Sequence, residues 1–195
     1  METSTKIVLA AGATAIVVSG IVIYVNRHTI FDKVKMITTK NYFTIGELTA
    51  SDTAKAKKID NTPTPAAKQN LQELITNVLN PVREIYGQPI TVSSGYRSPA
   101  LNAAVGGAST SQHQTGQAAD LVPANKKGSL EQIFAACVAV GNYDQLIIEQ
   151  NSKGQRWVHV SYDPAKNRRQ MMSFVANRNP QYINITADKA KQYFA

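Results

Sequence analysis

Two histidine-containing segments constrain the fold of this chain most, because their side chains act together only if the chain brings them to one place. The first is SQHQTGQAAD, from Ser111 to Asp120, and the second is WVHVS, from Trp157 to Ser161. Together they offer His113, Asp120 and His159 as ligands. Two imidazoles and one carboxylate suit zinc, and three protein ligands leave a fourth position for water, the pattern of a catalytic zinc site.

The spacing within the first segment supports this interpretation. His113 and Asp120 are separated by a Thr115-Gly116 pair. A glycine lets the chain turn tightly, so a ligand from a loop and a ligand from the following strand can meet. A lone histidine is more often a satisfied polar residue than a ligand, and the argument therefore depends on the combination of the two segments.

Composition narrows the class of protein. A chain of 195 residues holds one ordinary domain plus an appendage, and 43% hydrophobic residues permit a core. The single cysteine, Cys137, excludes both an intramolecular disulfide and a cysteine-rich zinc site. The net charge of +8 lies mainly in the flanks, outside residues 41–159. Without a dense Lys/Arg run or interleaved aromatic residues, we expect no nucleic-acid partner.

The N-terminal part contains an uncharged stretch from Ile7 to Val25. As a helix it would reach about 28 Å, close to the hydrocarbon core of about 30 Å. The alternative is a cleaved signal peptide. Only Lys6 supplies a basic side chain before the stretch, and no small-x-small pattern follows it, so the sequence favours an uncleaved single-pass anchor in contact with lipid.

The remaining sequence predicts an α+β domain, with a small antiparallel sheet and packed helices carrying the zinc site. We expect an anchor over residues 1–25, a connector over 26–41, this domain over 42–175 and a basic tail over 176–195. An apolar stripe predicts a helix over 66–86, kinked or split at Pro81. The other expected elements are strands at 90–93 and 117–122, helices from 99 and over 130–140, and a hairpin of 145–149 with 156–162.

Five motifs in this order resemble a known family. They are SGYRSPALN (94–102), VGG (105–107), SxHxxGxAxD (111–120), QLIIE (145–149) and WVHVS (157–161). The chain is similar over residues 42–175 to the zinc D-alanyl-D-alanine carboxypeptidase and L-alanyl-D-glutamate endopeptidase family, closest to its phage and bacterial branch. The hedgehog signalling domain shares the fold of that family. The resemblance implies hydrolysis of amide bonds in peptidoglycan stem or cross-link peptides by a zinc-activated water.

The resemblance also assigns roles. His113, Asp120 and His159 match the zinc ligands, and Arg97 matches an arginine that binds substrate near the scissile carbonyl. A fixed guanidinium can stabilise an oxyanion or hold a carboxylate. The structural alternative for Arg97 is a surface arginine after a turn. Ser94, Tyr96 and Ser111 are candidates for orienting the ligands, with structural roles in turns as the alternative.

The general base departs from the family pattern. Many relatives have an acidic residue three positions before the last histidine ligand, where this chain has Arg156. Glu149 is the nearest candidate, and an exposed strand-end carboxylate is the alternative. Glu149 shares the face of His159 only if it pairs with an odd-numbered residue such as Trp157. Asp144 is a poorer candidate because it lies at the far end of its strand.

The expected protein is thus a membrane-anchored zinc peptidase of the cell envelope or of a lipid-containing phage virion. More positive charge follows the apolar stretch than precedes it, which would place the domain in the cytoplasm, whereas a wall-directed enzyme lies outside. The rule that positive charge stays in the cytoplasm does not fix the orientation of a protein in a virion membrane. Alternatives are a non-catalytic zinc-containing peptidoglycan-binding module and a virion structural protein, and Arg156 is the best support for a non-catalytic role.

Overall fold

The N-terminal residues that the structure describes form a small sheet of their own. The computed structural model describes residues 6–10, 13–18, 21–26, 40–179 and 181–194. Strands β1 (Lys6–Ala10), β2 (Ala13–Val18) and β3 (Ile21–Asn26) pair antiparallel in this order.

These strands differ from the single helix predicted over residues 7–25. The described parts of the segment are rich in valine and isoleucine, whose branching at Cβ lowers helix propensity and favours extended backbone. Length and lack of charge suggested a helix, but both properties are shared by apolar strands. Among the described residues, no helix has the length and apolar character needed to cross a membrane. The rest of the predicted anchor, and most of the connector, lie outside the described residues.

A six-stranded sheet forms the centre of the domain, with the spatial order β4-β5-β7-β6-β8-β9. Neighbouring strands are antiparallel, except that β6 and β8 are parallel. This sheet and its helices confirm the predicted α+β class. The strands are β4 (Ile90–Ser94), β5 (Ala118–Pro123), β6 (Gln145–Gln150), β7 (Arg156–Ser161), β8 (Gln170–Val175) and β9 (Tyr182–Asn184).

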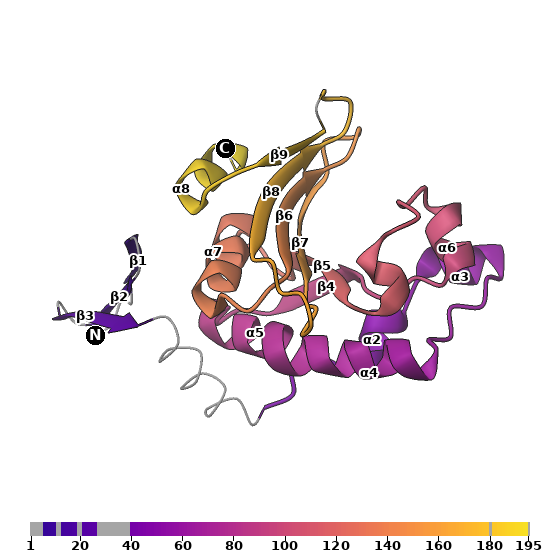
Figure 1. Cartoon of the computed structure of the whole chain (residues 1–195), viewed down its shortest axis with the longest axis horizontal. Helices are drawn as coiled ribbons and strands as arrows, with labels where there is room; N and C mark the ends of the chain where they lie inside the picture. The colour runs from indigo at the N-terminus through magenta and orange to yellow at the C-terminus, as the bar shows by residue number, and fades with distance from the viewer. Residues whose placement is uncertain (1–5, 11–12, 19–20, 27–39, 180, 195) are drawn as a thin grey trace.

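Helices surround this sheet (Figure 1). They are α2 (Ile45–Thr49), α3 (Asp52–Lys57), α4 (Pro65–Leu74), α5 (Asn80–Tyr86), α6 (Pro99–Ala104), α7 (Leu130–Val140) and α8 (Ala187–Ala190). Shorter turns are the π-helical η1 (Ile75–Leu79) and the 3-10 helices η2 (Gln112–Thr115) and η3 (Lys191–Tyr193).

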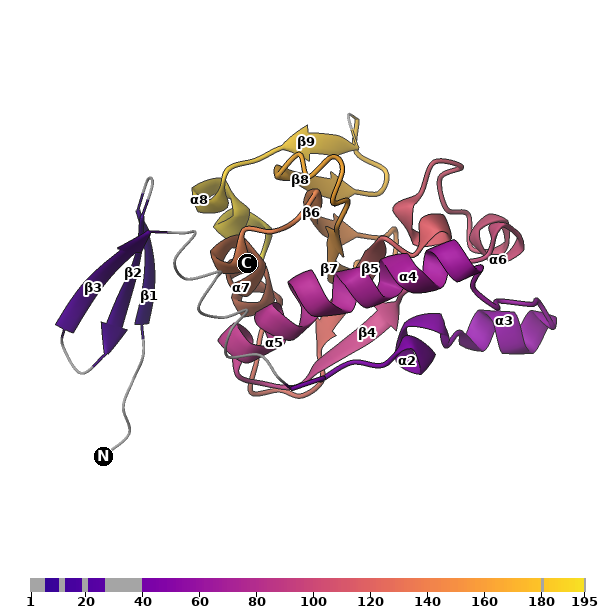
Figure 2. The ribbon, with the colours of Figure 1, turned by 60° about the horizontal axis from the view of Figure 1, so that its bottom comes forward.

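The predicted helix over 66–86 is present as the continuous run of α4, η1 and α5, seen along its length in Figure 2. Thr64 caps its start through a hydrogen bond to the amide of Ala67. Pro81 has no N–H for a helical hydrogen bond, and the wider π turn directly before it accommodates that loss. The apolar stripe, including Leu71, Leu74 and Leu79, is buried in the core.

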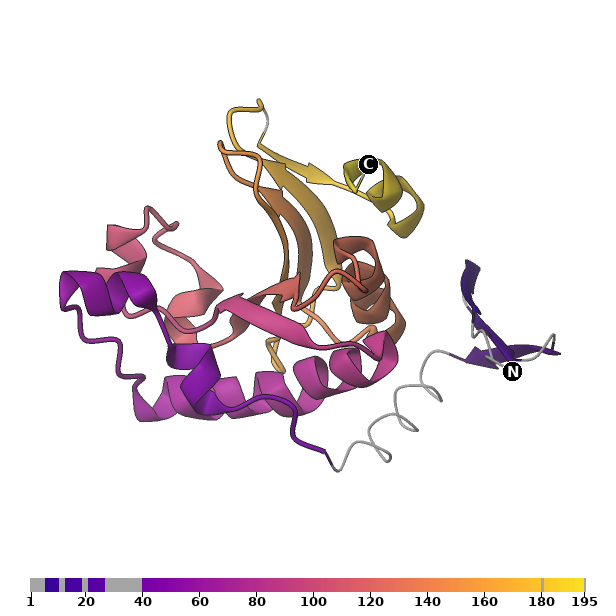
Figure 3. The same cartoon turned by 180° about the vertical axis from the view of Figure 1, so that it is seen from behind.

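The two faces of the sheet have different surroundings. Helix α7 packs on β5, β6 and β7 and against α5, and its side chains Ile133, Phe134 and Cys137 are buried in the core. Figures 1 and 3 show α7 and α8 on one side of the strands, with α6 on the other side. The open face, toward α6, carries the histidines discussed below.

The described part of the predicted basic tail, residues 176–179 and 181–194, packs on the sheet. β9 pairs with β8, and Ile185 and Ala190 are buried in the core. The ring of Phe194 contacts that of Phe134, with centroids 5.7 Å apart. The sequence did not predict this packing, because the segment is basic and has few apolar residues. Each contact depends on the position of α7 and β8 rather than on a local pattern.

Candidate metal centre and active site

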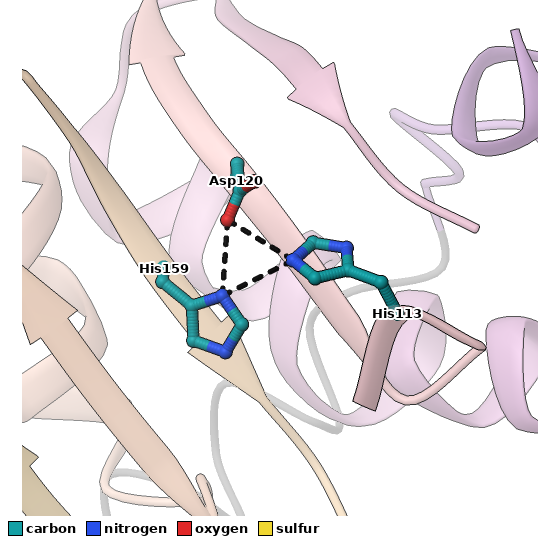
Figure 4. Close-up of side chains that lie close together, drawn as sticks. All are labelled: His113, Asp120 and His159. Carbon is teal, nitrogen blue, oxygen red and sulfur yellow. Dashed lines mark hydrogen bonds and ion pairs between the residues drawn. The ribbon is translucent and has the colours of Figure 1, made fainter. Parts of the chain in front are cut away.

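Three side chains from three elements converge on the open face of the sheet (Figure 4). His113 comes from η2, Asp120 from β5 and His159 from β7, where the register places Asp120 directly opposite His159. The Nδ1 of His159 lies 3.0 Å from Asp120 Oδ1 and 3.2 Å from His113 Nε2. His113 Nε2 lies 3.3 Å from the same Asp120 oxygen. The structure therefore brings together the three residues proposed as zinc ligands.

This cluster fits a zinc ion. Tetrahedral coordination with bonds of about 2.0–2.1 Å places ligand atoms about 3.3–3.4 Å apart, close to the separations found here. His113 Nδ1 lies 2.6 Å from the carbonyl oxygen of Gly95, an acceptor that requires the ring proton on Nδ1. The Nε2 lone pair of His113 then points at a carboxylate oxygen and a second imidazole nitrogen. A lone pair that faces a carboxylate oxygen at this distance is stabilised by a cation bound between them.

Gly116 determines how the turn reaches the strand. Its φ of +73° lies in the left-handed region, where a side chain is strained. A Cβ at this position would also lie 2.4 Å from the carbonyl oxygen of Ala67 on α4. The glycine therefore allows η2 to end against α4 and to lead directly into β5, which is the tight turn expected between the two ligands.

Burial and mutual charge set the ionisation of the cluster. His113, Asp120 and His159 are all buried. Burial lowers the pKa of His113, which favours the neutral, metal-binding imidazole. Burial alone would raise the pKa of Asp120, but the charges and hydrogen bonds of the two histidines hold it well below its usual range. The pKa of His159 is raised, because the hydrogen bond and charge of Asp120 outweigh burial.

Arg97 lies beside the cluster. Its Nη2 donates to Asp120 Oδ2 over 2.8 Å, and its Nε donates to Ser94 Oγ over 2.8 Å. The guanidinium thus holds one oxygen of Asp120 while the other faces the histidines. The other two predicted partners of the ligands, Tyr96 and Ser111, both line the cavity described below; Tyr96 is also packed into the core, and Ser111 directly precedes η2.

Glu149 lies on the same face as His159. The β6–β7 register pairs Glu149 with Trp157, the arrangement on which a role in the site depends. Its Oε1 lies 3.9 Å from His159 Nδ1. Burial of the carboxyl, which outweighs the neighbouring His159, raises the pKa of Glu149 to about 7. A carboxyl with such a pKa can both accept and return a proton near neutral pH.

Arg156, which stands where many relatives have an acid, and Asp144, the poorer candidate for the base, both have other partners. Arg156 donates from Nε to Gln150 Oε1 over 2.8 Å and from Nη1 to the carbonyl oxygen of Tyr193 over 2.9 Å. Asp144 is buried and accepts hydrogen bonds from the side chains of Arg168 and Gln112. The side chain of Arg156 therefore helps to hold the C-terminal segment, and that of Asp144 holds Arg168 and Gln112.

The cluster opens into a cavity of about 1170 Å³. One wall is the open face of the sheet, with Glu149 and Trp157, and the other comes from α2, α3 and the end of α6. Glu47, Asp52 and Glu149 add acidic groups to the lining. Among the described residues that line the cavity, Arg97 is the one permanent cation.

Two features of the site were not anticipated from the sequence. The carbonyl of Gly95 orients His113, and the chain Arg168–Asp144–Gln112 reaches the residue next to His113. A backbone acceptor leaves no residue-type signal in a sequence. Asp144 directly precedes the QLIIE motif, but its partner Arg168 lies beyond all five motifs.

Comparison with known proteins agrees with this geometry. A family model described as peptidase M15 matches residues 41–161, which include the whole metal cluster, Arg97 and Glu149. No curated protein matches the chain closely enough to count as a relative. The matched segment covers more than half of the chain and contains β4 to β7 with the helices around them. The chain therefore belongs to the peptidase M15 family of zinc metallopeptidases.

Proposed function

We propose that this protein is a zinc peptidase that hydrolyses amide bonds within the peptides of peptidoglycan. The observation that carries the proposal is the position of Glu149, which shares a sheet face with His159 and lies beside three converging metal-ligand atoms. A carboxylate next to a three-ligand site with an open cavity is the arrangement needed for hydrolysis.

The residues of the chain have distinct tasks in this reaction. Zinc bound by His113, Asp120 and His159 would supply Lewis acidity to a carbonyl and to water. Glu149 accepts a proton from the attacking water and returns it to the departing amine. Arg97 keeps Asp120 in place, and its remaining N–H groups can donate to the substrate oxygen.

The charges in the cavity favour cleavage of internal bonds. A carboxypeptidase has to hold a terminal carboxylate, usually with a free cation. Here the cation of the described lining, Arg97, is already paired with Asp120, and the acidic side chains Glu47, Asp52 and Glu149 disfavour a further anion. We therefore propose endopeptidase activity, with substrate chain extending on both sides of the metal centre.

Digestion of purified peptidoglycan tests this function. Zinc-loaded protein should release peptide fragments whose new ends come from cleavage within the peptide, and a chelator should abolish the release. Free D-alanine as the main product would instead indicate a carboxypeptidase. Binding to peptidoglycan without any cleavage would support the non-catalytic binding module, the alternative suggested by Arg156 in the position of the usual acid.

Membrane association through residues 7–25 is a separate proposal. It is supported by the uncharged composition of this segment, and it would place the enzyme at a cell envelope or in a lipid-containing virion. Alkaline carbonate extraction should leave the protein in the membrane pellet. Recovery in the supernatant, or as a chain that starts after Val25, would contradict it.

A further inference from the structure

A row of four side chains crosses the open face of the sheet next to the metal cluster. Glu149 lies opposite Trp157 on β7 and opposite Phe174 on β8, and Phe174 lies opposite Tyr182 on β9. Directly opposed residues on neighbouring strands share a face of the sheet. The carboxyl of Glu149 is therefore flanked by aromatic side chains on both sides.

The outer part of this row is an exposed aromatic pair. The ring centroids of Phe174 and Tyr182 lie 4.7 Å apart, with an interplanar angle of 44°. Tyr182 is 51% exposed although it packs on its neighbour.

A second exposed apolar side chain faces the same cavity. Among residues 40–179 and 181–194, the large hydrophobic side chains left exposed are Tyr182 and Val105, which is 47% exposed at the end of α6. Both line the cavity of the metal centre. In Figures 1 and 3, α6 stands across from the strands of the sheet. Exposed apolar groups on opposite walls of a cavity are typical of a ligand-binding groove.

We propose that Phe174 and Tyr182 form a subsite for an alkyl-bearing residue of the substrate peptide, next to the bond that is cleaved, with Val105 on the opposite wall of the cavity. The inference rests on the proposed peptidase function and adds a specificity determinant to it. Phe174 and Tyr182 lie beyond residue 161, where the family match ends, so this subsite belongs to strands that the matched segment lacks.

The chemistry of the row selects the occupant. Apart from Glu149, the row consists of aromatic rings, which gain free energy when they cover alkyl groups. An anionic side chain would meet the carboxylate of Glu149, and it would find no cation in the row. An alkyl side chain, such as the methyl of alanine, can be covered by the aromatic rings and carries no negative charge. A sugar ring of the glycan strand is the competing occupant, because it can also stack on an aromatic face.

The single tryptophan of the chain makes the subsite measurable. Trp157 is the only tryptophan and belongs to the row, so its fluorescence reports binding separately from hydrolysis. Wild-type protein and the variants Tyr182→Ala and Tyr182→Phe would be compared as zinc-loaded full-length chains. The ligands are a peptidoglycan stem peptide alone and the same peptide attached to its disaccharide. Gln181→Ala is the matched control, because this neighbouring side chain is also exposed.

We expect Tyr182→Ala to raise Kd and KM by about 3- to 10-fold for both ligands, the range expected for the loss of one aromatic contact. The value of kcat should change less than about twofold, because the acid–base group is intact. Tyr182→Phe should restore wild-type values, and Gln181→Ala should match the wild type.

Other outcomes overturn the assignment in distinguishable ways. If Tyr182→Ala weakens binding of the disaccharide-bearing ligand alone, the subsite binds sugar rather than peptide. If the wild type binds and cleaves the peptide while Tyr182→Ala has unchanged Kd and KM, the subsite is refuted and the proposed function stands. If the wild type neither binds nor cleaves either ligand, the proposed function fails, and the subsite with it.

Discussion

Arg97 and Asp120 form an ion pair in which the guanidinium holds the carboxylate oxygen that does not face the histidines, at 2.8 Å. The same carboxylate therefore has one oxygen held by the protein and the other left for a metal ion. Contacts of this kind orient a ligand before the ion binds and reduce the entropy lost on binding.

The first prediction concerns this ion pair. Arg97→Ala should lower zinc affinity by about 10- to 100-fold, the usual cost of losing a partner of a metal ligand. Competition with a chromogenic chelator measures the affinity. Arg83→Ala, which removes an arginine on α5 outside the cavity lining, is the control. Unchanged zinc affinity in Arg97→Ala would mean that this arginine serves the substrate alone.

The second prediction tests the ligand set itself. His159→Ala should reduce bound zinc from about one equivalent to near zero at micromolar metal, because two ligands remain of three. Elemental analysis of dialysed protein measures the stoichiometry. His28→Ala removes the third histidine of the chain, which lies outside both motifs, and should leave zinc content unchanged. A full equivalent of zinc in His159→Ala would refute the proposed site.

The third prediction separates the base from the metal ligands. Glu149→Gln should keep zinc and fold but lower kcat by about 10²- to 10⁴-fold, because proton transfer is lost while the shape of the side chain is kept. Peptide release from peptidoglycan and zinc content would be measured on the same sample. Glu131→Gln, on the exposed start of α7, should behave as the wild type. Near-normal turnover in Glu149→Gln would place the base elsewhere.

The fourth prediction concerns stability and pH. Asp144 is 1% exposed, and its carboxylate accepts from Arg168 Nη2 over 2.6 Å and from Gln112 Nε2 over 2.9 Å. Burial alone would raise the pKa of Asp144, but the hydrogen bonds and charge of Arg168 lower it overall. A carboxyl with a lower pKa in the folded state stabilises the fold above its unfolded pKa, about 3.9, and loses that contribution as pH falls through the folded value.

Asp144→Asn should therefore reduce the free energy of unfolding by about 1–3 kcal/mol at pH 7, the range for charged hydrogen bonds with one partly exposed partner. The difference from the wild type should shrink below about pH 4. Urea unfolding of the metal-free protein at pH 7 and pH 3 measures it. Asp188→Asn, an exposed carboxylate on α8, is the control. A difference that does not depend on pH would show that the charge of Asp144 contributes nothing.

Local sequence determined most elements of the domain and the identity of the candidate ligands. The apolar stripe of the helix that contains Pro81 and the glycine that ends α7 depend on neighbours within a few residues. The left-handed φ of Gly116 is likewise a local requirement of the turn between His113 and Asp120, whereas its close approach to Ala67 is set by the position of α4.

Tertiary structure decided what no local pattern contains. The register that pairs Glu149 with Trp157 chooses which face its carboxyl occupies, since a slip of one residue reverses every side chain of a strand. The strands described within residues 7–25 differ from the helix that their apolar composition suggested. Apolar composition alone does not distinguish a helix from a strand, and valine and isoleucine favour extended backbone. Phe174 and Tyr182 reach the cavity of the metal centre only because β8 pairs with the far edge of β6 and β9 pairs with β8, and such pairing depends on contacts distant in sequence.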